Sequence, residues 1–406
     1  MMRITHGVMV NGFLTDMNTN LNQLNKIQTQ LNTGKVFSKP SDDPFKVARS
    51  MQMYSEINAN KQYNTNIKDT INWMDTTDTA LSNSTKCLQR IRELMVSAGN
   101  AAYGSSELSA IKDEISERVA EFGQILNTSF DGKYIFGGKD GAVKPVKVVE
   151  KPVQVIGSGN AVSEEIDVNN LEGYTGSESE LKVSGIKEVV PATTPAKYNV
   201  DINGTSHEVS ADADGNYKLD VDGLEFDFTE VISKSPSDTD TWDINLNSTK
   251  KSIEVNGDEN LIDKNLKVEI SSGVTVDYNA NAMEILKFKD GDGNDVDVMK
   301  FLDDLVNNLS SEDGKSKVIG ENLDTIDKIL NNMLSVSSRV GTVQNRMESA
   351  KDLNEAQNEN MTDILSSNED INFVEKAMEM AVAQTVYVAA LQTSAKVLQP
   401  TILNYL

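Results

Sequence analysis

Cysteine and histidine are almost absent from this sequence of 406 residues. Cys87 is the only cysteine, so the chain can form neither an intrachain disulfide nor a cysteine metal cluster. The two histidines, His6 and His207, stand about 200 positions apart, and no Gly-x-Ser-x-Gly motif is present. The sequence therefore shows no pattern of residues that would form a nucleophile activated by a neighbouring base. We predict that the protein is not an enzyme. Cys87 falls on an apolar helical stripe and is expected to be a buried thiol.

Positive charge is also scarce. Lysine and arginine number 38 against 62 acidic residues, a net charge of −24, which argues against binding to a phosphate backbone. No window reaches the roughly 18 apolar residues of a membrane span, and the N-terminus lacks an apolar run of signal-peptide length. We expect no nucleic-acid partner and no membrane insertion. Taken alone, these rules predict a cytoplasmic protein.

Proline and arginine divide the chain into three zones. Five of the eight prolines lie within 145–236, whereas none of the seven arginines lies between 141 and 304. The interval 141–304 carries 33 acidic residues and 15 lysines, which is most of the net charge. Short alternating runs such as KYNVDING and KSIEVNGDENL occur there, bounded by Asn-Gly and Asp-Gly pairs. Such pairs favour hairpin turns, so 141–304 is predicted to be a mostly β insertion.

The flanks have a helical period instead. Nothing interrupts the apolar pattern between Pro44 and Gly99, which predicts one helix of about 80 Å at 1.5 Å per residue. Stripes of this a/d type require partner helices. The predicted fold is a mainly α rod of long, coiled-coil-like helices from both chain ends, with the β domain inserted between them, α+β overall. Apolar residues recur every three or four positions in 14–31, 74–95, 111–126, 336–347 and 371–398.

The sequence SKPSDDPFK predicts a break between the first two helices. Pro40 lacks a backbone donor and disfavours helix in the residue before it, so it ends the segment that runs to about Thr33. Asp43 followed by Pro44 is a start signal, with a side-chain acceptor at the N-cap and proline at the first helical position. On local grounds alone, this is an ordinary helix–loop–helix corner.

The two terminal segments carry almost no charge. Lys26 is the only charged residue between Met17 and Gly34, and Lys396 is the only one from Met380 to Leu406. A helix with one face in water normally carries many charged residues. We expect these helices to be covered first by each other and then by other subunits; the alternative is a large intramolecular core. The residues predicted to make these subunit and axial contacts are Leu14, Met17, Leu21, Leu24, Ile27, Leu31, Val374, Met378, Ala381, Val388, Leu391, Ala395 and Leu398.

The acidic stretch DGDGNDVDV matches part of a calcium-binding EF-hand loop. Asp290, Asp292 and Asn294 occupy the first three ligand positions. The sixth position should be glycine and is Asp295, and the twelfth should be glutamate and is Phe301, so a hairpin turn is the better interpretation. The glycines of FGGKDG and VIGSGN lack the spacing of a phosphate-binding loop. We predict neither a metal site nor a cofactor.

Several motifs together resemble the flagellin family of axial proteins. LNTGKVFSKPSDDPFKVA, at 31–48, is similar to the corner where a terminal helix of that family ends and the first long helix begins. Its Pro-Ser-Asp-Asp-Pro, and GKYIFGGKDG at 132–141, resemble the hook-associated type 3, junction members of the family rather than flagellin proper. LQRIRELMVSAGN, VSSRVGTVQNRME and LQTSAKVLQPTILNYL resemble the family's long and terminal helices. The resemblance covers about 1–141 and 315–406.

This resemblance implies three layers. The terminal helical pair would form the inner axial layer, the helical rod would surround it, and the acidic β-rich domain would be a variable outer domain of one or two subdomains. The expected boundaries are 1–43 plus 366–406 for the pair, 44–140 plus 305–365 for the rod, and 141–304 for the outer domain. Pro40, Asp43 and Pro44 would then form the joint between pair and rod.

The resemblance also implies a function and partners. The chain would be a structural subunit of the bacterial flagellum, an adaptor at the hook–filament junction on which flagellin polymerises. Its partners would be hook-associated protein type 1, flagellin, further copies of itself in a ring, and a cytoplasmic export chaperone. We expect the chaperone to bind Val374, Met378, Leu391 and Leu398.

The family leaves the cell through the flagellar type III export apparatus without a cleaved signal peptide. The resemblance therefore overrides the cytoplasmic prediction and places the protein outside the cell, in the flagellum. Two alternatives stay open. One is flagellin itself, the bulk filament subunit, and the other is an adhesin or glycan-degrading module carried by 141–304. Trp242 and Tyr278 could contribute to a glycan-binding face, although a buried Trp242 is the simpler expectation.

Overall fold

The computed structural model describes residues 6–99, 104–156, 165–169, 171–189, 196–212, 215–236, 239–310, 318 and 320–397. The chain divides into two compact units, which are described separately. The first comprises Met1–Ile67, Ile270–Val274 and Glu348–Leu406, and the second comprises Lys68–Glu269 and Thr275–Met347. No helix within the described ranges is long and apolar enough to cross a membrane.

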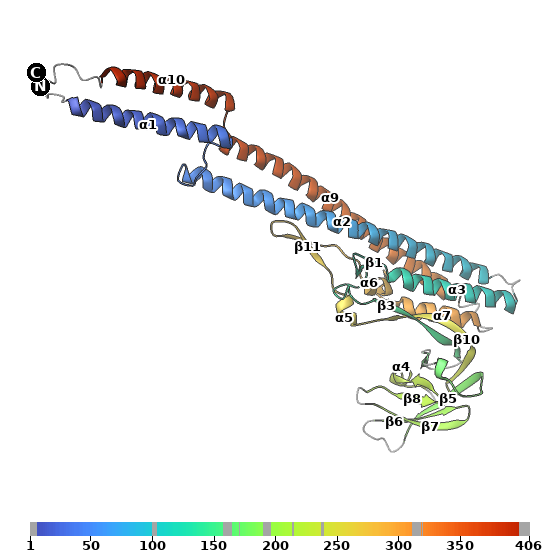
Figure 1. Cartoon of the computed structure of the whole chain (residues 1–406). Helices are drawn as coiled ribbons and strands as arrows, with labels where there is room; N and C mark the ends of the chain where they lie inside the picture. Colours follow the sequence, from blue (N-terminus) through green and yellow to red (C-terminus); the bar gives the residue numbers. More distant parts are fainter. Residues whose placement is uncertain are drawn as a thin grey trace, which may run out of the picture. The chain divides into compact units, whose positions relative to one another are not determined.

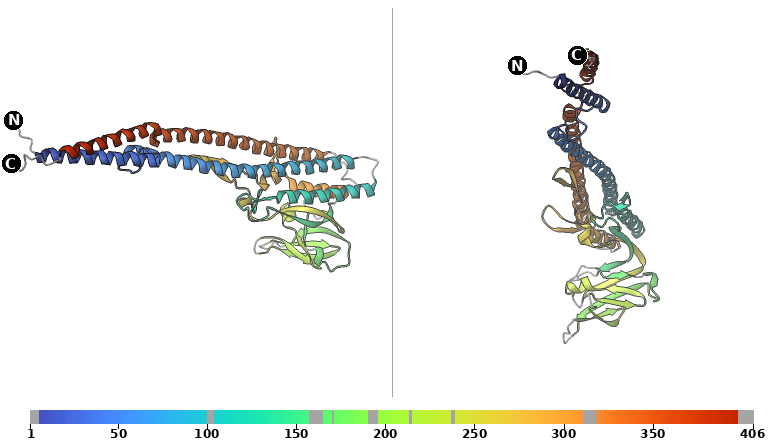
Figure 2. Two further views of the ribbon diagram at one scale, coloured as in Figure 1. Left: turned by 45° about the horizontal axis from the view of Figure 1, so that its top comes forward. Right: turned by 60° about the vertical axis from the view of Figure 1, so that its left-hand side comes forward.

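The first unit is built from helices. It holds α1 (His6–Thr33), α10 (Phe373–Val397), the first part of α2 (Pro44–Ala98) and the last part of α9 (Glu321–Glu369). Helices α1 and α10 lie side by side and antiparallel (Figures 1 and 2). The single helix predicted between Pro44 and Gly99 is confirmed as α2, and the C-terminal flank is helical as predicted, in the two helices α9 and α10.

A buried asparagine joins α9 to a hairpin of the inserted region. Strands β11 (Lys267–Ser271) and β12 (Val274–Asp277) form this hairpin, whose turn belongs to the first unit. Asn354, only 1% exposed, donates to the carbonyl oxygen of Ile270 at 2.9 Å and to Oδ1 of Asn64 on α2 at 3.1 Å. Because a buried amide needs its partners, this position fixes the hairpin against both helices.

In the second unit, the predicted apolar stripes form the core. On α2, Met74, Leu81, Leu88, Ile91 and Met95 are completely buried. Helix α3 (Ser105–Leu126) buries one stripe of its own beside them, and α9 buries the predicted stripe that includes Val336, Val340 and Met347. Helix α7 (Val298–Ser310) and the short α6 (Ala282–Leu286) complete the layer. The stripe of α3 comprises Ile115, Val119, Phe122 and Leu126.

A long two-stranded ribbon leads from this helical core into the rest of the insertion. Strands β3 (Val146–Ile156) and β10 (Thr241–Val255) pair antiparallel, with a break in register between Asn245 and Thr249 of β10. One half of the ribbon packs against α3 and α7. The approach to α3 is close, because a Cβ on Gly123 would lie 2.7 Å from Cγ2 of Val148.

The other half of the ribbon belongs to a separate β lobe (Figure 2). Strands β5 (Glu180–Glu188), β6 (Lys197–Ile202) and β7 (Thr205–Ser210) extend the sheet in the order β3-β10-β5-β6-β7. A second sheet, β4-β9-β8, and α4 (Thr229–Ser233) close the lobe over Trp242. Its strands are β4 (Asp167–Asn169), β8 (Lys218–Val221) and β9 (Leu224–Asp227).

The predicted hairpin turns are present in the insertion. Asn203-Gly204 and Asp222-Gly223 each have positive φ at both positions, which suits type I′ turns between β6 and β7 and between β8 and β9. The acidic stretch from Asp290 is also a turn, between β13 (Lys287–Lys289) and β14 (Asp295–Asp297). Hydrogen bonds from Asn294 lower the pKa of Asp290 to about 2.

The described residues also form several short elements. Strands β1 (Ser129–Phe130) and β2 (Lys133–Tyr134) form a hairpin, η1 (Leu171–Gly173) is a single 3₁₀ turn, and α5 (Glu259–Ile262) follows β10. The insertion is thus mostly β, as predicted, although it also contains α4, α5, α6 and the start of α7.

Candidate assembly surface: the terminal helix pair and its joint

At one end of the α1–α10 pair, the segment that connects α1 to α2 is hydrogen-bonded to the segment that connects α9 to α10. Gly34, with φ of +71°, ends α1, and its N–H donates to the carbonyl of Gln30 at 2.8 Å. The N–H of Val36 donates to the carbonyl of Glu369 at 2.6 Å, and that of Ile371 donates to the carbonyl of Gly34 at 3.0 Å. This short antiparallel bridge ties the α1–α2 connection to the α9–α10 connection.

Three side chains reinforce the bridge. The Lys35 ammonium donates to Oε1 of Glu369 at 2.5 Å and to the Tyr54 hydroxyl at 2.8 Å, and Tyr54 donates to the same Glu369 oxygen. The ammonium also lies 5.4 Å from the centroid of the Tyr54 ring. The hydrogen bond to Glu369, followed by that to Tyr54, raises the pKa of Lys35 above its usual range. We call Lys35, Tyr54 and Glu369 the joint cluster.

The proline corner lies beside the joint cluster. Pro44 is the first residue of α2, and Oδ1 of Asp43 accepts from the N–H of Lys46 at 3.1 Å, which is an N-cap bond. Pro40 lies in the turn before it. Oδ2 of Asp42 accepts from two backbone N–H groups of this turn, and the bond from Ser38 holds the pKa of Asp42 below its usual value. Local hydrogen bonds therefore determine the whole corner.

Helix α1 presents the predicted stripe to α10. Ile27 is 5% exposed, and Met17, Leu24 and Leu31 are half-buried. Leu14 and Leu21, in contrast, remain exposed.

Helix α10 meets α1 with a face that the sequence analysis did not single out. Lys376 and Glu379 are half-buried near its start, and its half-buried apolar positions, Met380, Ala383, Tyr387 and Ala390, recur every three or four residues. The two alanines allow the helices to approach closely, and this small-residue spacing was available in the sequence as a signal.

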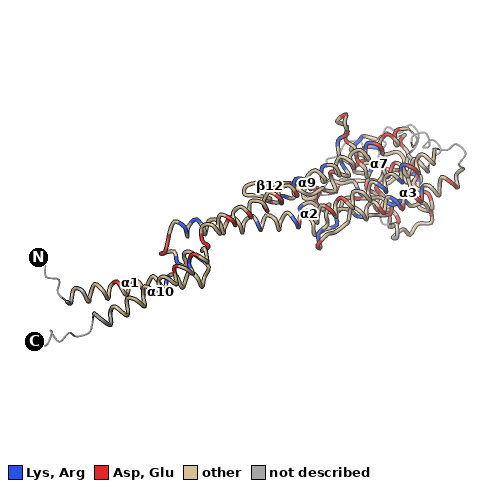
Figure 3. The backbone as a smooth tube through the Cα atoms, turned by 90° about the horizontal axis from the view of Figure 1, so that it is seen from above, with Lys and Arg blue, Asp and Glu red and all other residues tan. Residues whose placement is uncertain are grey.

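The predicted α10 stripe is mostly exposed rather than packed against α1. Val374 and Met378 are 67% and 60% exposed, Val388 and Leu391 are also exposed, and Ala381 is exposed too. Ala395 lies near the end of α10, where its side chain is not described, and Leu398 lies outside the described residues. Figure 3 shows how few charges α1 and α10 carry compared with the second unit. The pair thus has apolar surface in excess of what its two helices cover.

A groove of about 790 Å³ runs between the two helices on one side. Its wall on α10 is formed by Met378, Val382 and Val386, and its wall on α1 includes Gln23 and Ile27. One end of the groove is charged, with Glu375 and an ion pair in which Lys376 and Glu379 lie 2.6 Å apart. The remaining lining residues are Asn20 and Ala383.

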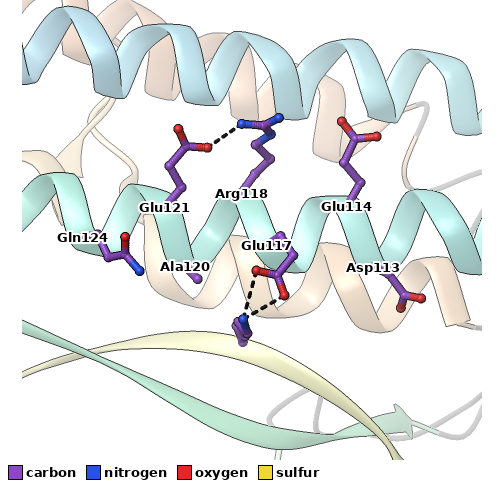
Figure 4. A pocket seen from close by; sticks show the side chains of 8 residues that line it. Asp113, Glu114, Glu117, Arg118, Ala120, Glu121 and Gln124 are labelled. Carbon is purple, nitrogen blue, oxygen red and sulfur yellow. Dashed lines mark hydrogen bonds and ion pairs between the residues drawn. The ribbon is translucent and has the colours of Figure 1, made fainter.

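A second groove, on α3 in the other unit, is lined by acidic residues (Figure 4). Its carboxylates have basic partners. Arg118 lies 2.5 Å from Glu121, and Lys251 lies 2.8 Å from Glu117. Paired, exposed charges of this kind indicate a solvated surface rather than a reactive one.

The most unusual titratable groups lie on α7 and on the ribbon packed against it, and sequence reasoning missed them. Lys250 of β10 is completely buried and lies 2.7 Å from Glu165. Ser252 donates to Asp303 at 2.8 Å. Burial, with Glu165 nearby, raises the pKa of Asp304 to about 7, and burial raises that of Asp303 to about 6. No cluster of metal-ligating residues occurs in the part of the chain that the structure describes.

Two predictions about single residues are also settled. Cys87 is buried, and its thiol donates to the carbonyl of Arg118 at 3.2 Å. Burial raises the pKa of this thiol to about 12. Trp242 is completely buried in the β lobe, which removes it from any glycan-binding face.

The two helical ends of the chain match known protein families. Residues 4–140 match the bacterial flagellin N-terminal helical region, and residues 323–406 match the bacterial flagellin C-terminal helical region. The two matches together span more than half of the chain. Flagellin of Clostridium tyrobutyricum is 31% identical over 160 residues, which is 39% of this chain and 42% of that protein. Flagellin of Bacillus subtilis strain 168 is 32% identical over 140 residues, 34% of this chain and 46% of that protein. The matched regions thus span less than half of these relatives.

Solved structures of flagellar proteins are similar over most of this chain at low identity. A putative flagellar hook-associated protein from Vibrio parahaemolyticus has a TM-score of 0.49 and 15% identity, covering 81% of this chain and 100% of that one. The flagellar junction protein FlgL from Legionella pneumophila has a TM-score of 0.37 and 16% identity, covering 80% and 100%. On the two sequence matches, which take in both helical ends, this chain belongs to the flagellin family, a family of structural proteins of the bacterial flagellum and not of enzymes.

Proposed function

We propose that this chain is the adaptor at the junction between the flagellar hook and the filament, on which flagellin polymerises. Hook-associated protein type 1 would lie on one side and flagellin on the other, with copies of this chain forming a ring between them. In this role 1–43 plus 366–406 form the inner axial layer, 44–140 plus 305–365 the rod, and 141–304 the outward domain. Export would use the flagellar type III apparatus without a cleaved signal peptide.

The observation that carries an assembly role is the uncovered apolar surface of the terminal helices. Val374 and Met378 are more than half exposed on α10, and beyond Glu379 this helix carries only one charged residue, Lys396. A monomeric protein rarely leaves such a row in water. Cover from neighbouring subunits explains both the exposure and the missing charge, and the hydrogen-bonded joint would hold the pair in place for those contacts.

The assignment to the junction rather than to the bulk filament is supported by two motifs. One is the Pro-Ser-Asp-Asp-Pro corner. The other is Tyr-Ile-Phe-Gly-Gly, whose Ile135 and Phe136 are completely buried and whose Gly138 has φ of +57°. A Cβ on Gly138 would lie 2.1 Å from the carbonyl oxygen of Ile262, so only glycine fits. This motif thus fastens the exit of the chain from α3 to α5.

Deletion of the gene, followed by electron microscopy of the cells and assay of the medium, tests this proposal. The expected result is hooks without filaments, with flagellin monomers in the medium, and restoration of filaments by the intact gene. Normal filaments after deletion would contradict the adaptor role.

Bulk flagellin is the second candidate, since the same sequence matches support it. Copy number distinguishes the two, because a junction needs about one ring of subunits.

We also propose that an export chaperone binds the exposed α10 stripe before assembly. Val374, Met378 and Leu391 are exposed in the single chain and therefore accessible to a partner; Leu398 completes the proposed set. Replacing Val374 and Met378 by aspartate should abolish retention of the chaperone in a pull-down. The exposed polar residue Thr385 offers a matched control, since Thr385→Asp adds charge to the same helix. Undiminished binding by the double variant would refute the assignment.

A further inference from the structure

The two sides of the α1–α10 pair carry different apolar surfaces. The groove lies on one side, and its α10 wall is exposed. Met378 and Val382 are 60% and 63% exposed, and Val386 is 47% exposed. These residues are four positions apart, so their side chains repeat about every 6 Å along the groove. The groove is therefore open, with an apolar stretch along α10, polar Asn20 and Gln23 on the α1 side, and charged residues at one end.

The opposite side carries a row of leucines. Leu14 and Leu21 of α1 are 41% and 38% exposed. Successive residues advance about 100° round a helix, so these leucines lie roughly 120–140° from Ile27, in the direction opposite to that of Gln23 on the groove wall. Leu391 of α10 is 41% exposed and continues the row.

The position of Leu391 follows from the same geometry. Taken from Ala383, which faces α1, Leu391 lies roughly 80° round α10 in one direction, whereas Val386 on the groove wall lies roughly 60° in the other. We call Leu14, Leu21 and Leu391 the leucine ridge.

We infer that the groove of one copy receives the Leu14–Leu21 part of the leucine ridge of a neighbouring copy. The inference rests on the proposed assembly of copies and specifies which surfaces meet. Because ridge and groove lie on opposite sides of one helix pair, a copy cannot fill its own groove. The contact is therefore heterologous, and repeating it gives a closed ring or a helical array.

Length and charge both support this pairing. Leu14 and Leu21 are seven residues apart, about 10 Å along the helix, while Met378 and Val386 span about 12 Å. Two leucines thus fit within one groove length. Between Leu14 and Leu21 the only charged residue is Asp16, which lies roughly 140–160° round α1 from the two leucines, so the leucine ridge brings no ion into the apolar part of the groove. The carboxylates at the far end of the groove stay beside Lys376.

Cysteine cross-linking tests the pairing directly. Cys87 is 5% exposed, and burial suppresses its ionisation, so it does not compete with introduced cysteines. Two full-length variants are made, Leu21→Cys and Val382→Cys, and both replaced side chains are exposed, so the fold of each copy is expected to persist. The variants are produced together, distinguishable by size tags, in cells lacking the natural gene, and their detached flagella are oxidised. A disulfide heterodimer should form in clear excess over both homodimers.

The outcomes separate this inference from the proposed function. Gln52→Cys, an exposed position on α2, replaces Leu21→Cys as the matched control and should give only background cross-linking with Val382→Cys. Variants that are present in the flagella without the heterodimer would overturn the ridge–groove pairing alone, as would Leu21 homodimers in excess. Absence of the stable, intact chain from the flagella would instead contradict the proposed function. Purified natural-sequence chain, oxidised in parallel, should give no disulfide dimer.

Discussion

Lys35 and Glu369 are 334 positions apart in the sequence, yet their side-chain nitrogen and oxygen lie 2.5 Å apart at the joint below the terminal helix pair. The Glu369 side chain is only 7% exposed, whereas that of Lys35 is 40% exposed. The carboxylate is therefore the buried partner, and it depends on Lys35 and Tyr54 for its hydrogen bonds.

Removing Lys35 should loosen the joint. In Lys35→Ala, Glu369 keeps the Tyr54 hydroxyl but loses its cation, so we expect a local loss of about 1–2 kcal/mol, moderated by the water that reaches Lys35. Hydrogen exchange of the Val36 and Ile371 amides measures this, because both take part in the backbone bridge. Their exchange should quicken about 5- to 30-fold. Lys39→Ala, an exposed lysine in the same connection, is the control, and equal protection in both variants would contradict the prediction.

The half-buried carboxyls of Asp303 and Asp304 on α7 should make the second unit more stable in mild acid. The pKa of Asp304 is about 7 and that of Asp303 about 6, both raised mainly by burial near Glu165, whereas an unfolded aspartate has a pKa of about 3.9. Between pH 8 and pH 5 the folded state therefore takes up protons that the unfolded state does not, and stability rises as pH falls.

Nearby lysines reduce, but do not cancel, the rise in the pKa values of Asp303 and Asp304. Lys250 of the ribbon lowers the pKa of both carboxyls, Lys151 lowers that of Asp303, and Lys300 lowers that of Asp304. Asp304→Asn should raise stability at pH 8 by on the order of 2 kcal/mol and by clearly less at pH 5, where the folded-state carboxyl is already protonated. Thermal unfolding at both pH values measures this. Asp113→Asn, at an exposed acid on α3, controls for net charge, and parallel pH curves for Asp304→Asn and the natural chain would refute the assignment.

Substitutions of Ile27 and of Leu14 should distinguish helix contacts within one copy from contacts between copies. Ile27 is 5% exposed in the α1–α10 pair, so Ile27→Ala should cost about 2–4 kcal/mol of that local packing and expose α1 to hydrogen exchange in the monomer. Leu14 is 41% exposed, and Leu14→Ala should leave monomer exchange unchanged while lowering incorporation into flagella. Equal effects of the two variants on the monomer would contradict this division.

The helical flanks could be predicted because their periodicity runs unbroken for many turns. What the periodicity could not decide is which stripe of α10 meets α1, since that helix is apolar on most of its surface. Val374 and Val388 repeat as regularly as Ala383 and Ala390, but only the small pair allows close approach of the helices. Which stripe packs against α1 depends on how the side chains of the two helices fit together. That fit cannot be predicted from the sequence of one helix alone.

The buried charges under α7 could not be predicted for a different reason. Lys250 and Lys251 are neighbours in one alternating run, and nothing local distinguishes them. The ribbon register and the irregularity after Asn245 turn Lys250 inward, completely buried, while Lys251 reaches the exposed Glu117 on α3. Helix α7 itself could have been predicted from the sequence, because Val298, Phe301 and later apolar residues recur at helical spacing, although α7 begins within the predicted β region.

The β lobe should unfold without the helical core, because the two have separate apolar interiors joined by the ribbon. Trp242 is completely buried among the lobe's aromatic residues, including Phe226 and Phe228. Trp242→Ala removes the largest side chain of a small core and should cost about 3–5 kcal/mol, enough to melt a lobe of this size. Limited proteolysis should then cut between 165 and 246 and leave the long helices intact.

The chain provides its own reporter for this separation. It has two tryptophans, so Trp73 is the only one left in Trp242→Ala. Trp73 is 8% exposed, with edge-on ring contacts to Phe130 at 6.0 Å and to Tyr278 at 6.1 Å, all outside the lobe. Its emission should stay blue-shifted while the lobe is cleaved. A red shift would mean that the ribbon transmits unfolding across the irregularity at Asn245, and that the insertion and the helices fold as one cooperative body.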